Sequence, residues 1–376
     1  MEFTCRTQDF ATAVDVVSRC LSPRPAKESY SYIQIEADGD CISVSATDGA
    51  MYMTANIEAD AEIIESGIIA LDGKLLAAIV QKQQEHIIAL SSNEKNCTLK
   101  CGKAKAQLSL RPAQDFPDMP PVNKASKSAK VAQRDLKSCI DYCSFCTATD
   151  QTRKVLTGVL MDFTEGDLHM VGLDGFRSAM RHVKCDYQGE ETKCVVPKSS
   201  AVEIAHLLED SETPASIRMT GEYLHIWVGK FAFSTILLTG EYIDVNRLIR
   251  TDCKTKALID AKQLRGCVER AQVMASSGKN DLIYLHFADN MLQITSHSAD
   301  GSANDELDIG LQGEPLDIAF NVRYLIDMLK HEPDGQLDVE CFGNVSPAVI
   351  RPLDKEDRLQ LVLPVRLTAA QSGGHA

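Results

Sequence analysis

The sequence predicts an α+β protein built from three copies of one domain, each with two helices packed on antiparallel sheets. An apolar stripe, a strand hairpin and a second helix recur in the same order. The stripe begins at Phe10, Leu136 and Leu264, which lie 126 and 128 residues apart. Apolar side chains follow each start at offsets of 3, 4, 7 and 10, the spacing of one buried face of an amphipathic helix. A repeat of this length can form a domain with its own core.

Each hairpin is indicated by strands of alternating apolar and polar residues around a turn. The three turns are Asp38-Gly39-Asp40, Glu165-Gly166-Asp167 and Ala288-Asp289-Asn290. A second helix is predicted at 73–83, 198–208 and 322–331, and further strands follow it in every copy. Helices on one face of antiparallel strands make an α+β domain. The predicted domains are 1–122, 129–250 and 254–367, followed by a flexible tail at 368–376.

The composition is that of an ordinary globular protein, with 376 residues, 44% of them apolar and 24% charged. No apolar run reaches the length of a membrane span and no signal sequence is visible, so we expect a cytoplasmic protein without a membrane partner. The thirteen cysteines are odd in number and occupy apolar positions, which favours free, mostly buried thiols. The net charge of −14 leaves room for one basic face, because binding depends on where the cations lie.

No catalytic or cofactor motif is present. The phosphate-binding loop, the dinucleotide-binding turn, the zinc-binding helix and the serine-hydrolase elbow are all absent from the sequence. We therefore expect no catalytic residues, no metal site and no cofactor.

One cysteine motif supports an alternative function. Cys139, Cys143 and Cys146 have the spacing that binds an iron–sulfur cluster in radical S-adenosylmethionine enzymes. The same positions belong to the apolar stripe that the other two repeats fill mostly with small apolar residues. That context favours buried structural thiols over a cluster, and an iron–sulfur enzyme stays as the rival hypothesis.

Five short strings occur in a characteristic order and spacing. They are Asp115-Phe116-Pro117, Leu156-Thr157-Gly158-Val159-Leu160, Asp174-Gly175-Phe176-Arg177, Phe320-Asn321-Val322-Arg323-Tyr324-Leu325-Ile326-Asp327 and Leu363-Pro364-Val365-Arg366-Leu367. Together with the threefold repeat, they resemble the bacterial DNA polymerase III beta subunits, the sliding clamps, over residues 1–367. The resemblance implies a head-to-tail homodimer, closed into a six-domain ring that holds duplex DNA by encirclement. A sliding ring needs only diffuse contact with phosphates.

The resemblance also implies DNA contacts and partners. Arg24 falls in a loop that reaches toward DNA, Arg153 and Lys154 fall in the corresponding loop of the second domain, and Lys198 lies near the start of an inner helix. The implied partners are double-stranded DNA without sequence preference, the alpha subunit of the replicative polymerase and the delta subunit of the clamp loader. Other polymerases and repair proteins are expected to bind through short peptide motifs. A scaffold of three domains that does not bind DNA is the third hypothesis.

A pocket for these peptides is implied between the second and third domains. Its residues are Leu156, Leu173, Gly175, Phe176, Arg177, Ser178, Ile243, Arg247, Leu248, Tyr324, Pro347, Leu361, Leu363, Pro364, Val365 and Arg366. Leu173 and Phe176 stand where the family usually has threonine and histidine, and Ile243 stands where it has proline. We therefore expect a more apolar pocket with a different peptide preference.

The dimer contact is implied by four residues. Leu108 of one chain is expected to meet Val273 and Met274 of the other. Ala106 stands where an aromatic residue is common, so we expect a weaker ring.

Overall fold

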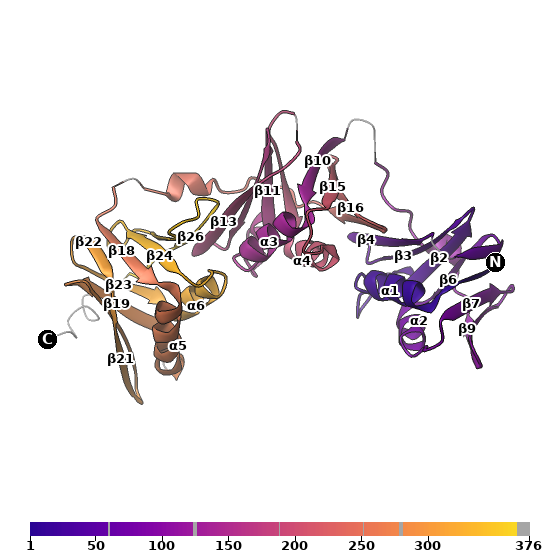
Figure 1. The fold of residues 1–376 in the computed structure, drawn as a ribbon, viewed down its shortest axis with the longest axis horizontal. Coiled ribbons are helices and arrows are strands. Elements are labelled where there is room, and N and C mark those ends of the chain that lie inside the picture. The colour runs from indigo at the N-terminus through magenta and orange to yellow at the C-terminus, as the bar shows by residue number, and fades with distance from the viewer. Residues whose placement is uncertain (59–60, 123–125, 188, 251, 278–280, 367–376) are drawn as a thin grey trace. The chain divides into compact units, whose positions relative to one another are not determined.

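The computed structural model describes residues 1–58, 61–122, 126–187, 189–250, 252–277 and 281–366 (Figure 1). The predicted tail at 368–376 lies outside this range. The first repeat contains, in order, β1 (Glu2–Arg6), α1 (Thr7–Ser18), η1 (Glu28–Ser31), β2 (Tyr32–Asp38), β3 (Cys41–Thr47), β4 (Met51–Ile57), β5 (Glu62–Glu65), β6 (Gly67–Asp72), α2 (Gly73–Val80), β7 (Ile87–Ser92), β8 (Asn96–Cys101), β9 (Ala104–Ser109) and η2 (Ala113–Asp115).

The second and third repeats follow the same plan. The second contains β10 (Lys127–Ala132), α3 (Gln133–Ser144), η3 (Lys154–Thr157), β11 (Gly158–Thr164), β12 (Asp167–Leu173), β13 (Arg177–Lys184), β14 (Thr192–Pro197), α4 (Lys198–Leu207), β15 (Pro214–Met219), β16 (Tyr223–Val228), β17 (Phe231–Ile236) and η4 (Val245–Leu248). The third contains β18 (Thr255–Asp260), α5 (Ala261–Ser277), β19 (Leu282–Ala288), β20 (Met291–Ser298), β21 (Gly301–Asp308), β22 (Gly310–Gly313), β23 (Leu316–Asn321), α6 (Val322–Lys330), β24 (Gln336–Cys341), β25 (Ala348–Pro352) and β26 (Arg358–Val362). The predicted fold class is confirmed.

The hairpin turns show why the chain reverses where the sequence predicts. Gly39 and Gly166 have φ angles of 56° and 78°, which glycine adopts without steric cost. The third hairpin lacks glycine, and Asp289 and Asn290 take φ angles of 52° and 59° there instead. Asparagine and aspartate tolerate this region because their side chains are short and polar.

Side-chain caps fix the starts of two of the second helices. The carboxylate of Asp72 accepts a hydrogen bond from the amide of Leu75 at 2.9 Å, and the Asn321 side chain accepts one from the amide of Arg323 at 3.0 Å. Each satisfies a helix N–H that has no partner within the helix. α2 and α6 therefore begin directly after their preceding strands.

The apolar stripes extend beyond two of the first helices. α1 ends at Ser18 and α3 at Ser144, so Cys20 and Cys146 lie past the helix ends, although both remain buried. α5 runs on to Ser277 and includes the whole stripe. The prediction of one continuous helical stripe is therefore corrected at its last position in the first two repeats.

The described chain divides into two compact units. Unit 1 comprises Met1–Lys137, Cys185–Glu190 and Ser199–Leu237, and unit 2 comprises Ser138–Lys184, Glu191–Lys198 and Leu238–Ala376. Unit 1 contains sheets of strand order β5-β1-β7-β8-β9 and β10-β15-β16-β17-β4-β3-β2-β6. Unit 2 contains sheets of order β14-β11-β12-β13-β26-β25-β24-β18-β22 and β21-β20-β19-β23.

The same strand pair joins successive repeats. In unit 1, β17 of the second repeat pairs antiparallel with β4 of the first, with Thr235 opposite Met51. In unit 2, β26 of the third repeat pairs antiparallel with β13 of the second, with Val362 opposite Arg177. We call these pairs the first seam and the second seam. The corresponding strands that remain, β9 and β21, end their sheets with one open edge among the described strands.

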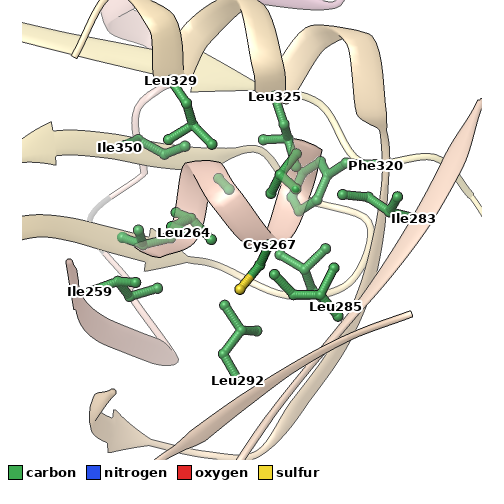
Figure 2. Close-up of a cluster of buried hydrophobic side chains, with 14 of the residues drawn as sticks. Ile259, Leu264, Cys267, Ile283, Leu285, Leu292, Phe320, Leu325, Leu329 and Ile350 are labelled. Atoms are coloured by element: carbon green, nitrogen blue, oxygen red, sulfur yellow. The ribbon is translucent and has the colours of Figure 1, made fainter. Parts of the chain in front are cut away.

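The core of the third repeat illustrates the packing (Figure 2). Leu264 and Cys267 of α5 and Leu325 of α6 face Ile283 and Leu285 of β19, and all are at most 7% exposed. Burial of each large aliphatic side chain contributes about 2 kcal/mol, so the two helices are held on the sheet by apolar contact. None of the described helices is long and apolar enough to cross a membrane.

Candidate functional site

A buried arginine lies at the second seam. Arg177 is 8% exposed, and its Nε and Nη1 donate hydrogen bonds to Asp174 at 3.0 Å and to Asp327 at 2.9 Å. Its guanidinium lies 4.7 Å from the ring centroid of Tyr324 and 5.4 Å from that of Phe145. Burial disfavours the charge, yet hydrogen bonds to Asp327 and Asp174 raise the pKa of Arg177 above its usual value. Arg177 therefore stays charged and connects the second repeat to α6 of the third.

An exposed aromatic side chain stands beside this arginine. Phe176 is 57% exposed, and its ring stacks on Tyr324 with centroids 5.8 Å apart. Its carbonyl accepts a hydrogen bond from the amide of Leu363 at 2.8 Å. The preceding Gly175 has a φ of 93°, and a Cβ placed on it would meet no atom within 4 Å. The turn thus presents a large apolar side chain beside open space.

Two apolar clusters contain five of the other predicted pocket residues, Leu156, Leu173, Ile243, Leu361 and Leu363. One consists of Leu156, Leu160, Val171, Leu173, Val195 and Val245, with Tyr242 and Ile243 packed against it. The other consists of Phe342, Val349 and Leu361, with Ile249, Leu359 and Leu363 packed against it. Such surfaces bind apolar peptide side chains, while a few polar groups set their orientation.

The predicted pocket residues all belong to unit 2 but differ in exposure. Leu156, Leu173, Arg177, Ser178 and Leu361 are buried; Ile243, Tyr324, Pro347, Leu363, Pro364 and Val365 are half-buried; Gly175, Phe176, Arg247, Leu248 and Arg366 are exposed. The buried ones support the surface more than they form it. Sequence reasoning missed Phe145, whose ring stacks on His331 with centroids 4.0 Å apart, because no pattern in the sequence marks that contact.

The predicted DNA-contact residues lie in two places. Arg153, Lys154 and Lys198 belong to unit 2, where Lys198 follows Pro197, the partner of Gly158 at the start of β11. These three cations therefore lie at one end of the β11–β14 ladder. Arg24 is exposed in the loop between α1 and η1 of unit 1. Among the described residues, none of the four cations forms an ion pair.

Charge is divided unevenly between helices and the remainder of the chain. The six α-helices together carry nine lysine and arginine residues and seven aspartate and glutamate residues, a net charge of +2. The whole chain carries −14. The helices are therefore the part of the protein best suited to face a polyanion.

The predicted dimer residues differ in how much surface they offer. Val273 is 76% exposed, whereas Leu108 is only 3% exposed within the single chain. Ala106 and Met274 are half-buried, and the Met274 sulfur lies 3.0 Å from the Ser298 hydroxyl. Leu108 lies on the same face of β9 as Ala106 and packs into the core, so it presents little surface for another chain.

The three clustered cysteines are packed too tightly for an iron–sulfur cluster. A Cβ on Gly172 of β12 would lie 1.9 Å from the Cys143 carbonyl oxygen and 3.3 Å from the Cys146 Cβ. Burial raises the pKa of the Cys143 and Cys146 thiols, which opposes the thiolate form that a cluster needs. Among the described residues, no group of three potential ligands could hold a metal ion. The iron–sulfur alternative is not supported, and all thirteen cysteines are free, ten of them buried.

Three repeated α+β domains that share sheets across their seams define the class of sliding-clamp folds. Models of the DNA polymerase III beta subunit match this chain with their N-terminal domain at 1–120, central domain at 130–244 and C-terminal domain at 246–366. The chain therefore belongs to the DNA polymerase III beta subunit family.

Similar proteins agree over nearly the whole length. The beta sliding clamp of Staphylococcus aureus (strain Mu50 / ATCC 700699) is 28% identical over 375 residues, covering 97% of this chain and 99% of that protein. The DNA polymerase sliding clamp from Bacillus subtilis is 26% identical, with a TM-score of 0.94 over 98% of this chain and 100% of that chain. A putative DNA polymerase III beta subunit from Eubacterium rectale is 26% identical, with a TM-score of 0.92 over the same shares.

Proposed function

We propose that this protein is a DNA sliding clamp, which encircles duplex DNA as a closed homodimer and tethers the replicative polymerase without performing a reaction. The strand pairing at the seams carries this proposal. Two repeat junctions within the chain use the same antiparallel pair, and the corresponding strands β9 and β21 are left with open edges. A third junction of the same kind between two chains, used twice, closes six domains into a ring.

The internal seams also predict the register of the junction between chains. The tight turns at Gly102 and Gly229 place Ala104 of β9 where Phe231 stands in β17. The turns that begin at Asp48, Asp174 and Ser298 likewise align β4, β13 and β21, because the Asp300 amide donates to the Ser298 hydroxyl as the Ala50 and Phe176 amides donate to Asp48 and Asp174. The inferred register sets Lys103 of one chain, the equivalent of Lys230, opposite Glu306 of the other, the equivalent of Asn56.

That register brings few apolar groups to the junction. It sets Ala106 opposite Ala303, and both are half-buried within the single chain. The equivalent pair at the first seam is Phe233 and Met53, both fully buried. A junction of two alanines buries less apolar area than phenylalanine and methionine do, which supports the expected weaker ring.

DNA is proposed to contact the helices and the basic loops. The net positive helices, with Arg24, Arg153, Lys154 and Lys198 on or beside them, offer diffuse attraction to phosphates without base recognition. The remaining negative charge discourages DNA from binding elsewhere on the surface.

Partner proteins are proposed to dock at the second seam. Phe176, Tyr324 and Leu363 would bind large apolar side chains of a short peptide, the exposed Arg247 and Arg366 would orient its polar groups, and the buried Arg177 would hold Tyr324 in place. Polymerase alpha subunit, clamp-loader delta subunit and repair proteins are the proposed owners of such peptides.

Retention on circular DNA tests the proposal directly. The protein is loaded onto nicked circular DNA with a clamp loader and ATP, and gel filtration in about 0.5 M salt separates bound from free protein, because such salt suppresses phosphate contacts. A ring stays on the circle and leaves when a restriction enzyme cuts it. A protein that leaves intact circles as fast as cut ones would be a scaffold or a simple DNA binder.

A further inference from the structure

The first seam has the same backbone as the second, at the place where the peptide pocket is proposed. The Asp48 carboxylate accepts hydrogen bonds from the amides of Ala50 and Met51 at 2.8 and 2.7 Å, as Asp174 accepts them from Phe176 and Arg177. The Ile236 amide donates to the Ala50 carbonyl at 3.0 Å, and the Leu363 amide donates to the Phe176 carbonyl at 2.8 Å. The chain therefore builds the scaffold of the pocket twice.

These bonds and the strand registers identify equivalent positions. Tyr30 in η1 corresponds to Leu156 in η3, because each helix leads directly into the next strand. Tyr52 corresponds to Ser178 through the pairing of β4 and β13 with their seam partners. Tyr223 corresponds to Pro347, since Leu224 and Ala348 pair with the equivalent residues Thr235 and Val362. Three tyrosines thus replace a leucine, a serine and a proline of the proposed pocket.

The tyrosines fill the space that is open at the second seam. A Cβ on Gly49 would lie 2.6 Å from the Tyr30 ring, whereas a Cβ on the equivalent Gly175 would meet nothing within 4 Å. Burial, with the neighbouring phenols of Tyr223 and Tyr30, raises the pKa of Tyr52, so the three side chains lie close together. The ring of Tyr30 covers the turn that Phe176 leaves accessible at the other seam.

We propose that Tyr30, supported by Tyr52 and Tyr223, closes the first seam to partner peptides, so that each chain presents one pocket instead of two. Tyr30 thus determines where peptides bind, because its ring fills the place at the first seam that a peptide would need. This inference rests on the proposed peptide pocket and adds to it the number of peptides that a chain can bind.

The test measures binding stoichiometry on the full-length protein. A synthetic peptide containing glutamine, leucine and phenylalanine is titrated by calorimetry into the wild type and into the variant Tyr30→Leu/Tyr52→Ser/Tyr223→Ala. The wild type is expected to saturate at one peptide per chain and the variant at two. The second site should be at least about tenfold weaker, because Ala50 and Ser200 stand where the pocket has Phe176 and Tyr324.

Controls locate the second site and separate the possible failures. Tyr30→Phe keeps the ring and should bind one peptide, and adding Ile236→Asp to the triple variant should remove the second site only. A wild type that binds no peptide contradicts the proposed pocket itself. A folded triple variant that still saturates at one contradicts the closure by tyrosine. If thermal unfolding shows that the triple variant is not folded, the single variant Tyr30→Ala is titrated instead. Two peptides per chain would support the closure by tyrosine, and one would contradict it.

Discussion

Glu332 shows at the scale of one residue how the second seam uses buried polar groups. Glu332 lies two residues after the end of α6 and is 3% exposed. Its Oε1 accepts hydrogen bonds from the Tyr142 hydroxyl at 2.5 Å and from Gln360 Nε2 at 2.6 Å. Its other oxygen has no partner among the described residues. Burial raises the pKa of Glu332 to about 7, although Tyr142, Arg358 and Gln360 act to lower it.

A buried carboxyl with a raised pKa makes stability fall as pH rises. Below about pH 4.5 the Glu332 carboxyl is protonated in both the folded and the unfolded chain. Between there and about pH 7 the unfolded chain loses the proton first, so folding is favoured less with each step in pH. The loss of unfolding free energy is complete above the pKa that Glu332 has in the folded chain, and it amounts to about 3 kcal/mol at most.

Glu332→Gln should therefore flatten the pH dependence of stability. The amide keeps the acceptor for Tyr142 and Gln360 but carries no charge, so the variant should lose less unfolding free energy than the wild type between pH 5 and pH 8. Urea unfolding at both pH values measures the difference. Glu356→Gln, an exposed carboxylate on a turn, is the control and should follow the wild type. Equal losses in Glu332→Gln and wild type would contradict the assigned role.

At the scale of elements, two strands carry the information about assembly. β9 and β21 are equivalent to β17 and β4, which pair inside the chain, yet both keep an open edge. Open edges of this kind tend to pair with another chain, and here they have complementary charges at Lys103, directly before β9, and at Glu306 in β21.

Lys103→Glu should weaken the dimer and Glu306→Lys should restore it. Like charges placed directly opposite each other destabilise an antiparallel pair, and the double exchange returns opposite charges to the same positions. Sedimentation velocity over a concentration series measures the dissociation constant, which should rise several-fold in Lys103→Glu and recover in the double variant. Lys355→Glu, an exposed cation on another turn, should leave it unchanged. No recovery in the double variant would mean that the inferred register is wrong.

At the scale of the whole molecule, charge placement matters more than net charge. The chain carries −14 in total while its helices carry a small positive excess. A local positive excess can attract a polyanion even where the net charge is negative, so the overall isoelectric point says little about DNA binding.

Replacing Arg24 and Lys154 together by alanine should weaken salt-sensitive DNA contact without unfolding the protein. Both side chains are exposed and, within the described chain, neither forms an ion pair, so their loss removes phosphate contacts and little else. Fluorescence anisotropy with a DNA duplex at several salt concentrations should show weaker binding and a shallower salt slope. Lys193→Ala, which removes a cation already paired with Asp162 and Glu191, is the matched control. If the double variant binds DNA at low salt as tightly as the wild type does, neither residue contacts DNA.

Local patterns in the sequence were enough to predict the repeat and its elements. Stripes such as the one beginning at Leu264 and turns such as Asp38-Gly39-Asp40 depend on neighbours within a few residues, so helices and hairpins could be predicted in order. The resemblance then implied a set of pocket residues, which stays a prediction, and it could not show that Leu156 and Leu173 are buried while Phe176 is exposed. The contact of Phe145 with His331, and the burial of Leu108, depend on segments far apart in the chain.

The sequence by itself determined three similar α+β domains, the placement of most cysteines at apolar positions and the absence of a recognisable catalytic motif. Each of these follows from residue spacing or composition. Only the tertiary structure decided that repeats join through β4 with β17 and β13 with β26, that Gly172 packs against Cys143, and that Tyr30 covers Gly49. These features depend on which strands pair and which side chains meet after folding. Sequence periodicity records which face of an element is buried, but it does not record the partner against which that face packs.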